Sequence, residues 1–108
     1  MNDKVQRAQT ESLFRDVNER IAESAQNFET DSTAFVCECS DPTCTARVHA
    51  TLDEYEEVRA DGATFLTTPG HVDEDIERVV SDRGRFQVIE KIQRTVRATV
   101  KRLNPRVA

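Results

Sequence analysis

Three cysteines fall within eight residues of this 108-residue chain, at Cys37, Cys39 and Cys44. Three thiols cannot all pair into disulfides, and clustered thiolates are typical ligands of zinc. Structural zinc sites take four tetrahedral ligands, commonly three cysteines and one histidine. The Asp41-Pro42 turn can fold Cys44 back towards the other two cysteines. The spacing therefore predicts a Zn²⁺ site that needs a fourth ligand from elsewhere in the chain.

Two histidines compete for that fourth position. His49 lies in a segment of alternating polar and apolar residues, which is typical of a half-buried strand and would direct its ring to solvent. His71 follows Pro69-Gly70, a turn that leaves its side chain free to aim at the thiolates. We therefore expect His71 rather than His49 to complete the site. Metal binding at this set would add to the folding free energy. The predicted ligands are Cys37, Cys39, Cys44 and His71.

Other interpretations of these residues stay open. The Cys-x-Cys-x4-Cys spacing lacks the repeated Cys-x2-Cys unit of the commonest zinc sites. Cys37 could instead be an inward-facing core thiol, and Cys39 and Cys44 could be a redox pair. His71 could be a surface residue of its turn.

Helices are expected at both ends of the chain. Residues 3–28 lack glycine and proline, and their apolar side chains recur every three to four residues. We expect this helix to cover the core with the stripe Leu13, Phe14, Val17, Ile21, Ala25 and Phe28, and to leave Arg15, Asp16, Glu19, Arg20 and Glu23 on the solvent face. Residues 91–104 form a basic amphipathic stretch that ends at Pro105, with the stripe Ile92, Val96, Val100 and Leu103.

Between these helices the pattern changes to strands and turns. Segments 33–39 and 47–52 predict a β-hairpin whose connection carries the cysteines. Thr51 and Glu54 form a capping box that starts a short helix, which Asp61-Gly62 ends. Segments 77–80 and 86–89 predict a second hairpin with Gly84 in the left-handed conformation, and a short helix over 73–80 is the alternative.

The expected fold class is α+β. We expect a small domain that a zinc site stabilises, with two β-hairpins, a short central helix, and flanking N- and C-terminal amphipathic helices. Its parts are an N-terminal helix (1–28), a zinc-binding core (29–91) and a basic helix and tail (92–108), which together form one compact domain. The length leaves little room for a second core.

The same motifs carry a resemblance to a known group of proteins. The matching residues are Val17–Ile21, Phe35–Cys39, Cys44, Leu52–Ala60, Pro69–His71, Glu77–Val80 and Val88–Lys91. Over residues 12–91 the chain resembles small uncharacterised proteins common in actinobacterial genomes, with a Cys-Glu-Cys…Cys…Pro-Gly-His pattern. The resemblance implies an actinobacterial lineage and a cytoplasmic setting, and it implies no activity.

The motifs of common enzymes are missing from the sequence. A catalytic zinc keeps one coordination position open for water, whereas three thiolates and one histidine close the shell. The sequence contains no Gly-rich phosphate loop, Gly-x-Ser-x-Gly elbow or His-Glu-x-x-His motif. The acidic runs 54–57 and 73–75 lack the alternating ligands and glycine of a calcium loop. We therefore expect a protein that is not an enzyme.

Charge is distributed unevenly along the chain. Residues 1–90 hold nine Lys/Arg and all twenty Asp/Glu, a net charge of −11, while residues 91–108 carry +6. We expect a regulatory or protein-interaction module that binds a protein partner or itself through its amphipathic helices. The alternatives are a zinc-thiolate redox switch and a nucleic-acid-associated protein that uses the basic helix. No apolar run approaches the ~20 residues of a membrane span and the N-terminus is polar, so we expect a cytoplasmic protein without membrane contact.

Overall fold

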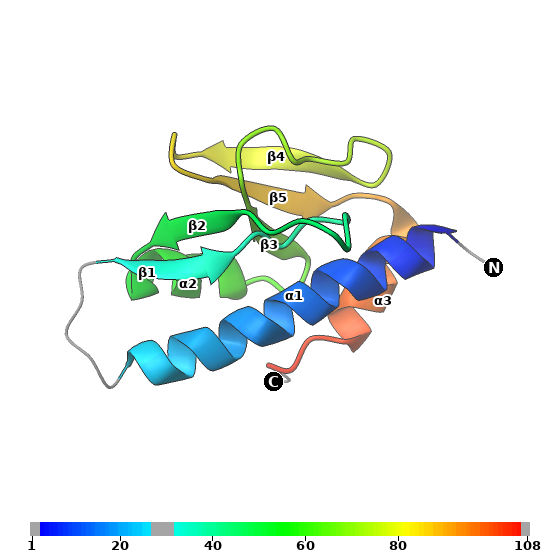
Figure 1. Cartoon of the computed structure of the whole chain (residues 1–108). Coiled ribbons are helices and arrows are strands. Elements are labelled where there is room, and N and C mark those ends of the chain that lie inside the picture. The colour runs from blue at the N-terminus through cyan, green and yellow to red at the C-terminus, as the bar shows by residue number, and fades with distance from the viewer. Residues whose placement is uncertain (1–2, 27–31, 107–108) are drawn as a thin grey trace.

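The computed structural model describes residues 3–26 and 32–106. In these residues the elements are α1 (Asp3–Ala25), β1 (Thr33–Val36), β2 (Arg47–Ala50), α2 (Leu52–Arg59), β3 (Thr64–Thr67), β4 (Glu77–Asp82), β5 (Gln87–Lys91) and α3 (Arg94–Arg102). Strands β1 and β2 form one antiparallel sheet, and a second antiparallel sheet has the strand order β3-β5-β4. Helix α1 runs the length of the molecule beside β1 and α3 (Figure 1). The predicted α+β class with two hairpins is confirmed.

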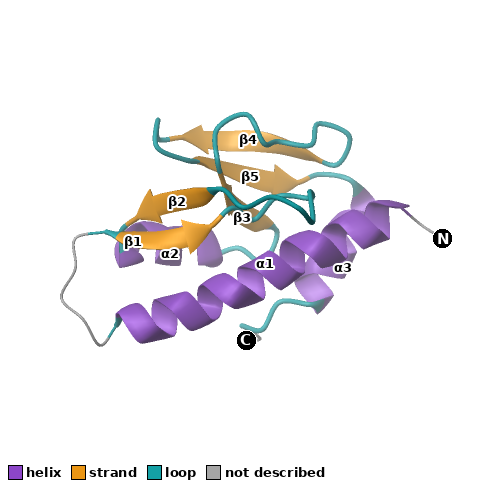
Figure 2. Ribbon diagram, in the orientation of Figure 1, coloured by secondary structure: helices purple, strands orange, loops and turns teal. Residues whose placement is uncertain are grey.

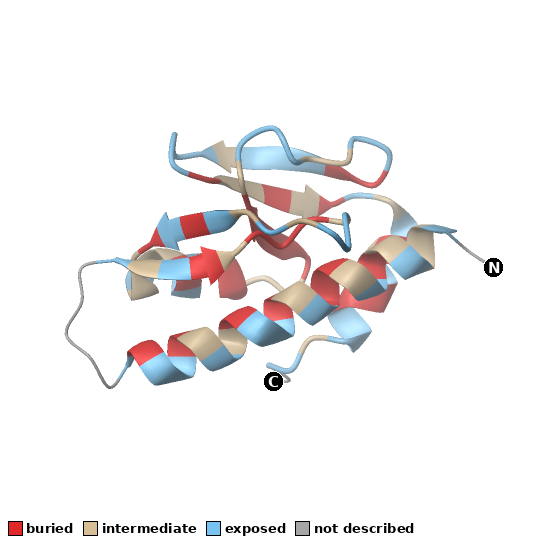
Figure 3. Ribbon diagram, viewed as in Figure 1, coloured by how far each residue is buried: buried red, intermediate tan, exposed pale blue. Residues whose placement is uncertain are grey.

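Helix α1 buries a different face from the one expected. Figure 3 shows its buried residues on the side towards the strands. That side consists of Ala8, Glu11, Ser12, Arg15, Asn18, Ala22 and Ala25. The predicted core residues Leu13 and Val17 are 63% and 39% exposed, and Phe28 lies outside the described residues. Arg15, expected in solvent, is fully buried, because its guanidinium donates to the carbonyls of Gly62 and Val100 at 2.8 Å each.

The first hairpin was predicted correctly. Its register pairs Thr33 with Ala50 and Phe35 with Val48, and both members of the second pair are fully buried. The ring of Phe35 stacks on Tyr55 of α2 at a centroid distance of 4.5 Å. The capping box at the start of α2 is also present, because Glu54 N donates to Thr51 Oγ1 and Thr51 N donates to the Glu54 carboxylate.

The second hairpin is also confirmed, and the sheet gains a strand that the sequence analysis missed. Gly84 adopts φ 77° in the β4–β5 turn, a left-handed conformation that glycine tolerates best. The alternative helix over 73–80 is absent, since residues 77–82 are strand β4. The short apolar patch at Phe65 and Leu66 is β3, fully buried and paired with β5.

Helix α3 is shorter than the predicted 91–104 segment and packs against α1. Val96 and Val100 of its apolar stripe are fully buried, whereas Ile92 is 51% and Leu103 is 38% exposed. Ile92 lies before the helix, in the connection that follows β5. The apolar contact of α3 is therefore restricted to its central turns.

A group of charges is buried beneath α1. Lys91, at the end of β5, donates hydrogen bonds to the carboxylates of Glu11 and Glu77, and all three side chains are fully buried. The ammonium group also lies 4.8 Å from the centre of the Phe65 ring. Burial raises the pKa of Glu11 well above its usual value. Lys91 lowers this pKa, and the nearby Glu77 carboxylate, which shares the same cation, raises it further.

Candidate metal centre

The three cysteines and His71 come from two connections between strands. Cys37 follows β1 directly, and Cys39 and Cys44 lie in the same β1–β2 connection. His71 lies in the β3–β4 connection, and Figure 2 shows both connections as loops in teal. One ligand atom from each of the four residues lies within 4.8 Å of all the others. All three cysteines are free thiols. The cluster could therefore hold a metal ion.

The distances to the histidine match those of a tetrahedral site. His71 Nδ1 lies 3.6 Å from Cys37 Sγ and 3.7 Å from Cys44 Sγ. A tetrahedron with Zn–S bonds of ~2.3 Å and a Zn–N bond of ~2.0–2.1 Å has an S···N edge of about 3.5–3.6 Å. Nδ1 is thus the ring nitrogen that faces the sulfurs. Because Cys37 Sγ and Cys44 Sγ are already at these separations from Nδ1, a metal bound to these two sulfurs would require little movement of the histidine.

Turn chemistry fixes the cysteine loop. The Asp41 carboxylate accepts hydrogen bonds from the amide and hydroxyl of Thr43, at 2.9 and 2.7 Å. The amide of Cys44 donates to the carbonyl of Asp41, and the amide of Cys37 donates to the carbonyl of Ala46. These bonds close the loop and bring Cys44 towards Cys37. This is the turn that the Asp41-Pro42 pair predicts.

A second turn fixes the histidine. The amide of His71 donates to the carbonyl of Thr68 at 3.1 Å, and Gly70 has a φ of 86°. Proline at the second position and a left-handed glycine at the third are typical of a type II turn. The turn is anchored to β5 by a hydrogen bond from the Gly70 amide to the Gln87 side chain. His49, by contrast, is exposed on β2 and is not part of the cluster.

Glu38, between the first two cysteines, faces away from the cluster into the core. Its fully buried carboxylate accepts hydrogen bonds from Asn18 Nδ2 at 2.7 Å and from the amide of Leu66 at 2.9 Å. Burial raises the pKa of Glu38. Asn18 also bonds both backbone groups of Val36, at 2.8 Å each. Glu38 and Asn18 therefore join α1, β1 and β3 directly behind the thiols, a role that the sequence analysis missed.

The three thiols differ in acidity. A hydrogen bond from the Cys39 thiol lowers the pKa of Cys37 against the effect of burial, and the Thr68 amide donates to the same sulfur at 3.2 Å. The hydrogen bond to Cys37 raises the pKa of Cys39, and burial adds to this effect. Burial raises the pKa of Cys44. Cys37 is thus the most acidic of the three thiols, and a metal that binds all three sulfurs would displace protons.

An acidic cleft borders the cluster. The cleft has a volume of about 600 Å³ and is lined by Cys39, Ser40, Asp41, Gly70, His71, Val72, Asp73, Glu74 and Asp75. Within it, Asp73 accepts hydrogen bonds from Arg7 of α1 at 2.6 Å and from Ser40 at 3.2 Å. The acidic run 73–75 therefore has one member that connects α1 to the cysteine loop.

The described part of the chain thus contains a Cys3His group of the type that binds metal ions. No protein-family model matches the chain, and no curated protein or solved structure matches it either. None of the described helices has the length and apolar character needed to cross a membrane.

Proposed function

We propose that this chain is a zinc-binding protein whose Cys3His site is structural and whose surface binds another protein. One observation carries the proposal: Cys37, Cys39, Cys44 and His71 place their ligand atoms within 4.8 Å of one another. Thiolate and imidazole ligands in a tetrahedral arrangement favour zinc over magnesium or calcium, which prefer oxygen ligands.

The positions of the ligands support a structural role. The cysteines belong to the connection within the β1–β2 sheet, and His71 follows β3 of the other sheet. A metal bound to all four would therefore join the two sheets, which already pack together where Phe35 and Val48 share a hydrophobic cluster with Leu66. Four protein ligands also leave no coordination position for a reacting water. We accordingly assign the site no catalytic step.

Exposed apolar side chains support a protein partner. Leu13, Val17, Val79, Val80, Ile92 and Leu103 are each between 38% and 63% exposed. Single exposed apolar residues are common, but Leu13 and Val17 are one helical turn apart on α1 and share a face.

The basic tail is less available for nucleic acid, because Arg106 binds the carboxylates of Glu19 and Glu56.

Metal analysis of the purified chain tests the zinc proposal. We expect about one zinc per chain by elemental mass spectrometry, because four ligands define one site. Cys44→Ser and His71→Ala should lose zinc and unfold at lower temperature, since structural zinc binding is coupled to folding. His49→Ala is the matched control and should keep both zinc and stability. A folded wild-type chain without metal, or full zinc retention in both ligand variants, would contradict the proposal.

A redox role is a second candidate, favoured by the exposure of one thiol. Cys37 and Cys39 are buried, but Cys44 is only partly buried and lies on the solvent side of the cluster. Peroxide could therefore reach its sulfur first. Loss of two thiolates to a disulfide would remove two metal ligands and loosen the joint between the sheets.

A further inference from the structure

The outer face of α1 carries apolar residues that the fold leaves uncovered. Leu13 is 63% exposed and is the most exposed large apolar side chain in the described residues. Val17, one turn further, is 39% exposed. Beyond it lies an apolar groove of about 570 Å³ between the C-terminal half of α1 and the start of β1. Its lining residues are Val17, Arg20, Ile21, Ser24, Ala25, Ser32 and Thr33.

We propose that this face of α1 binds the same face of a second copy of the chain in an antiparallel pair. With a twofold axis at Val17, Leu13 of one protomer lies opposite the partner's Ile21, eight residues along the helix. Leu13 therefore lies at the level of the partner's groove along the helix, and the symmetry repeats this arrangement at the other end. A protruding residue and a groove on one face are what an isologous interface requires.

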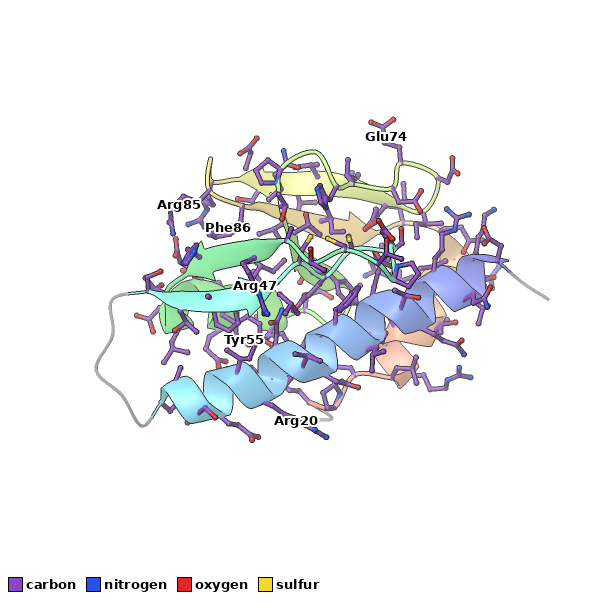
Figure 4. All side chains as sticks on the ribbon, in the orientation of Figure 1. Arg20, Arg47, Tyr55, Glu74, Arg85 and Phe86 are labelled. Atoms are coloured by element: carbon purple, nitrogen blue, oxygen red, sulfur yellow. The ribbon has the colours of Figure 1, made fainter. Side chains whose placement is uncertain are left out.

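Two charges beside the apolar residues select a second copy and an antiparallel orientation. Asp16 and Arg20 are both exposed on α1, and Figure 4 shows Arg20 pointing away from the strands. A twofold axis at Val17 brings Asp16 within two residues, about 3 Å along the helix axis, of the partner's Arg20. A parallel pair in register would instead place Asp16 beside the partner's Asp16. Of the two symmetric pairs of this helix, the antiparallel one is thus the pair in which the acid and the base are complementary.

The contact is small enough to be reversible. Helix α1 has 23 residues, a length of ~35 Å, and only its outer stripe would be covered. Such a contact falls at or below the ~1,200–2,000 Å² of stable protein interfaces, so we expect dissociation in the micromolar range. This pairing rests on the protein-interaction role proposed above, with a second copy of the chain as the partner. It does not depend on the identity of the metal.

Sedimentation equilibrium of the full, metal-loaded chain tests the pairing. Between about 5 and 500 µM, the range in which small interfaces dissociate, the mass should rise from 12.3 kDa towards that of two chains. Leu13→Glu should raise the Kd about tenfold or more, because it places a carboxylate in the apolar groove. Val80→Glu is the matched control, since Val80 is 46% exposed on β4, outside the proposed interface, and it should leave the Kd unchanged.

Charge exchange distinguishes this pairing from other uses of the surface. Asp16→Arg and Arg20→Asp should each weaken self-association, whereas their equimolar mixture should form a heterodimer with all pairs restored. A wild-type chain that stays monomeric at every concentration overturns the proposal. So does a mixture of the two charge variants that fails to associate. If Leu13→Glu lowers the melting temperature without changing the Kd, another part of the same chain covers Leu13 and the proposal is wrong. Zinc content should stay at wild-type level in all these variants, so failure here is distinct from failure of the metal site.

Discussion

Replacing Glu11 by glutamine should make the protein more stable at alkaline pH. The Glu11 carboxyl is fully buried and shares one ammonium group, that of Lys91, with Glu77. Burial raises its pKa well above the ordinary value of 4.5. Above pH 4.5 the unfolded chain therefore releases a proton that the folded chain retains. The stability that this proton contributes is lost as the pH rises through the folded pKa.

The size of the effect is set by the single proton involved and by the contacts of Glu11 with Lys91 and Glu77. Glutamine has the shape of the protonated acid, so its carbonyl can still accept from Lys91 and its amide can donate to Glu77. At about pH 5 the variant and the wild type should therefore differ by less than about 1 kcal/mol. At higher pH the difference should grow in favour of Glu11→Gln, with a slope of at most about 1.4 kcal/mol per pH unit, the limit for one proton.

Urea unfolding from pH 5.5 to 8.5 measures this difference. A metal bound to the thiolates would make every variant more stable as the pH rises, so only the difference between variants reports on Glu11. Glu23→Gln, an exposed glutamate on the same helix, is the matched control and should follow the wild type. A difference between Glu11→Gln and the wild type that is constant or shrinks with pH would refute the reasoning.

Two further predictions concern the residues behind and within the cysteine loop. Asn18→Ala should lower the free energy of unfolding by about 2–4 kcal/mol in urea, because it removes both hydrogen bonds to Val36 and one to the buried Glu38 carboxylate. Ser24→Ala, at an exposed position of the same helix, is the control and should lower it by less than about 0.5 kcal/mol. Equal losses in the two variants would contradict the role of Asn18. Limiting peroxide should oxidise two thiolates to a disulfide that includes Cys44, with uptake of two protons and formation of two waters, and should release one metal ion per disulfide. Peptide mass spectrometry with a zinc-sensitive dye checks this, and a first disulfide between the buried Cys37 and Cys39 would argue against it.

The features that the sequence predicted correctly depend on neighbouring residues. The Thr51–Glu54 capping box, the left-handed Gly84 and the Pro69-Gly70 turn before His71 are each determined within a few positions of the chain. Turn and cap chemistry of this kind can be recognised without knowledge of the rest of the fold. For the same reason the two hairpins and the cysteine turn were accessible. The grouping of His71 with the cysteines is not local, since 34 positions separate it from Cys37, and it followed from the ligand chemistry of zinc.

The inner face of α1 could not be found in that way. Its apolar periodicity favoured Leu13 and Val17, but the face that packs holds small residues and long polar side chains. Arg15 is buried because carbonyls of Gly62 and Val100, 47 and 85 positions away, accept its hydrogen bonds. Glu11 and Lys91 are 80 positions apart. Partners this distant are created by the fold itself, so periodicity assigned Arg15 to solvent and gave no indication of the Glu11–Lys91 pair.

Glu38 and Asn18 connect the turn of α1 that carries Val17 to the cysteine loop. Asn18 is adjacent to Val17 on α1, and Glu38 lies between two of the candidate metal ligands. A single hydrogen bond of 2.7 Å joins their side chains. Any shift of α1 that strains this bond acts on the cysteine loop, and any change in the loop acts on α1. Thermodynamic linkage requires such effects to be equal in both directions: a ligand on α1 that tightens metal binding by some factor is itself bound more tightly by the same factor when metal is present.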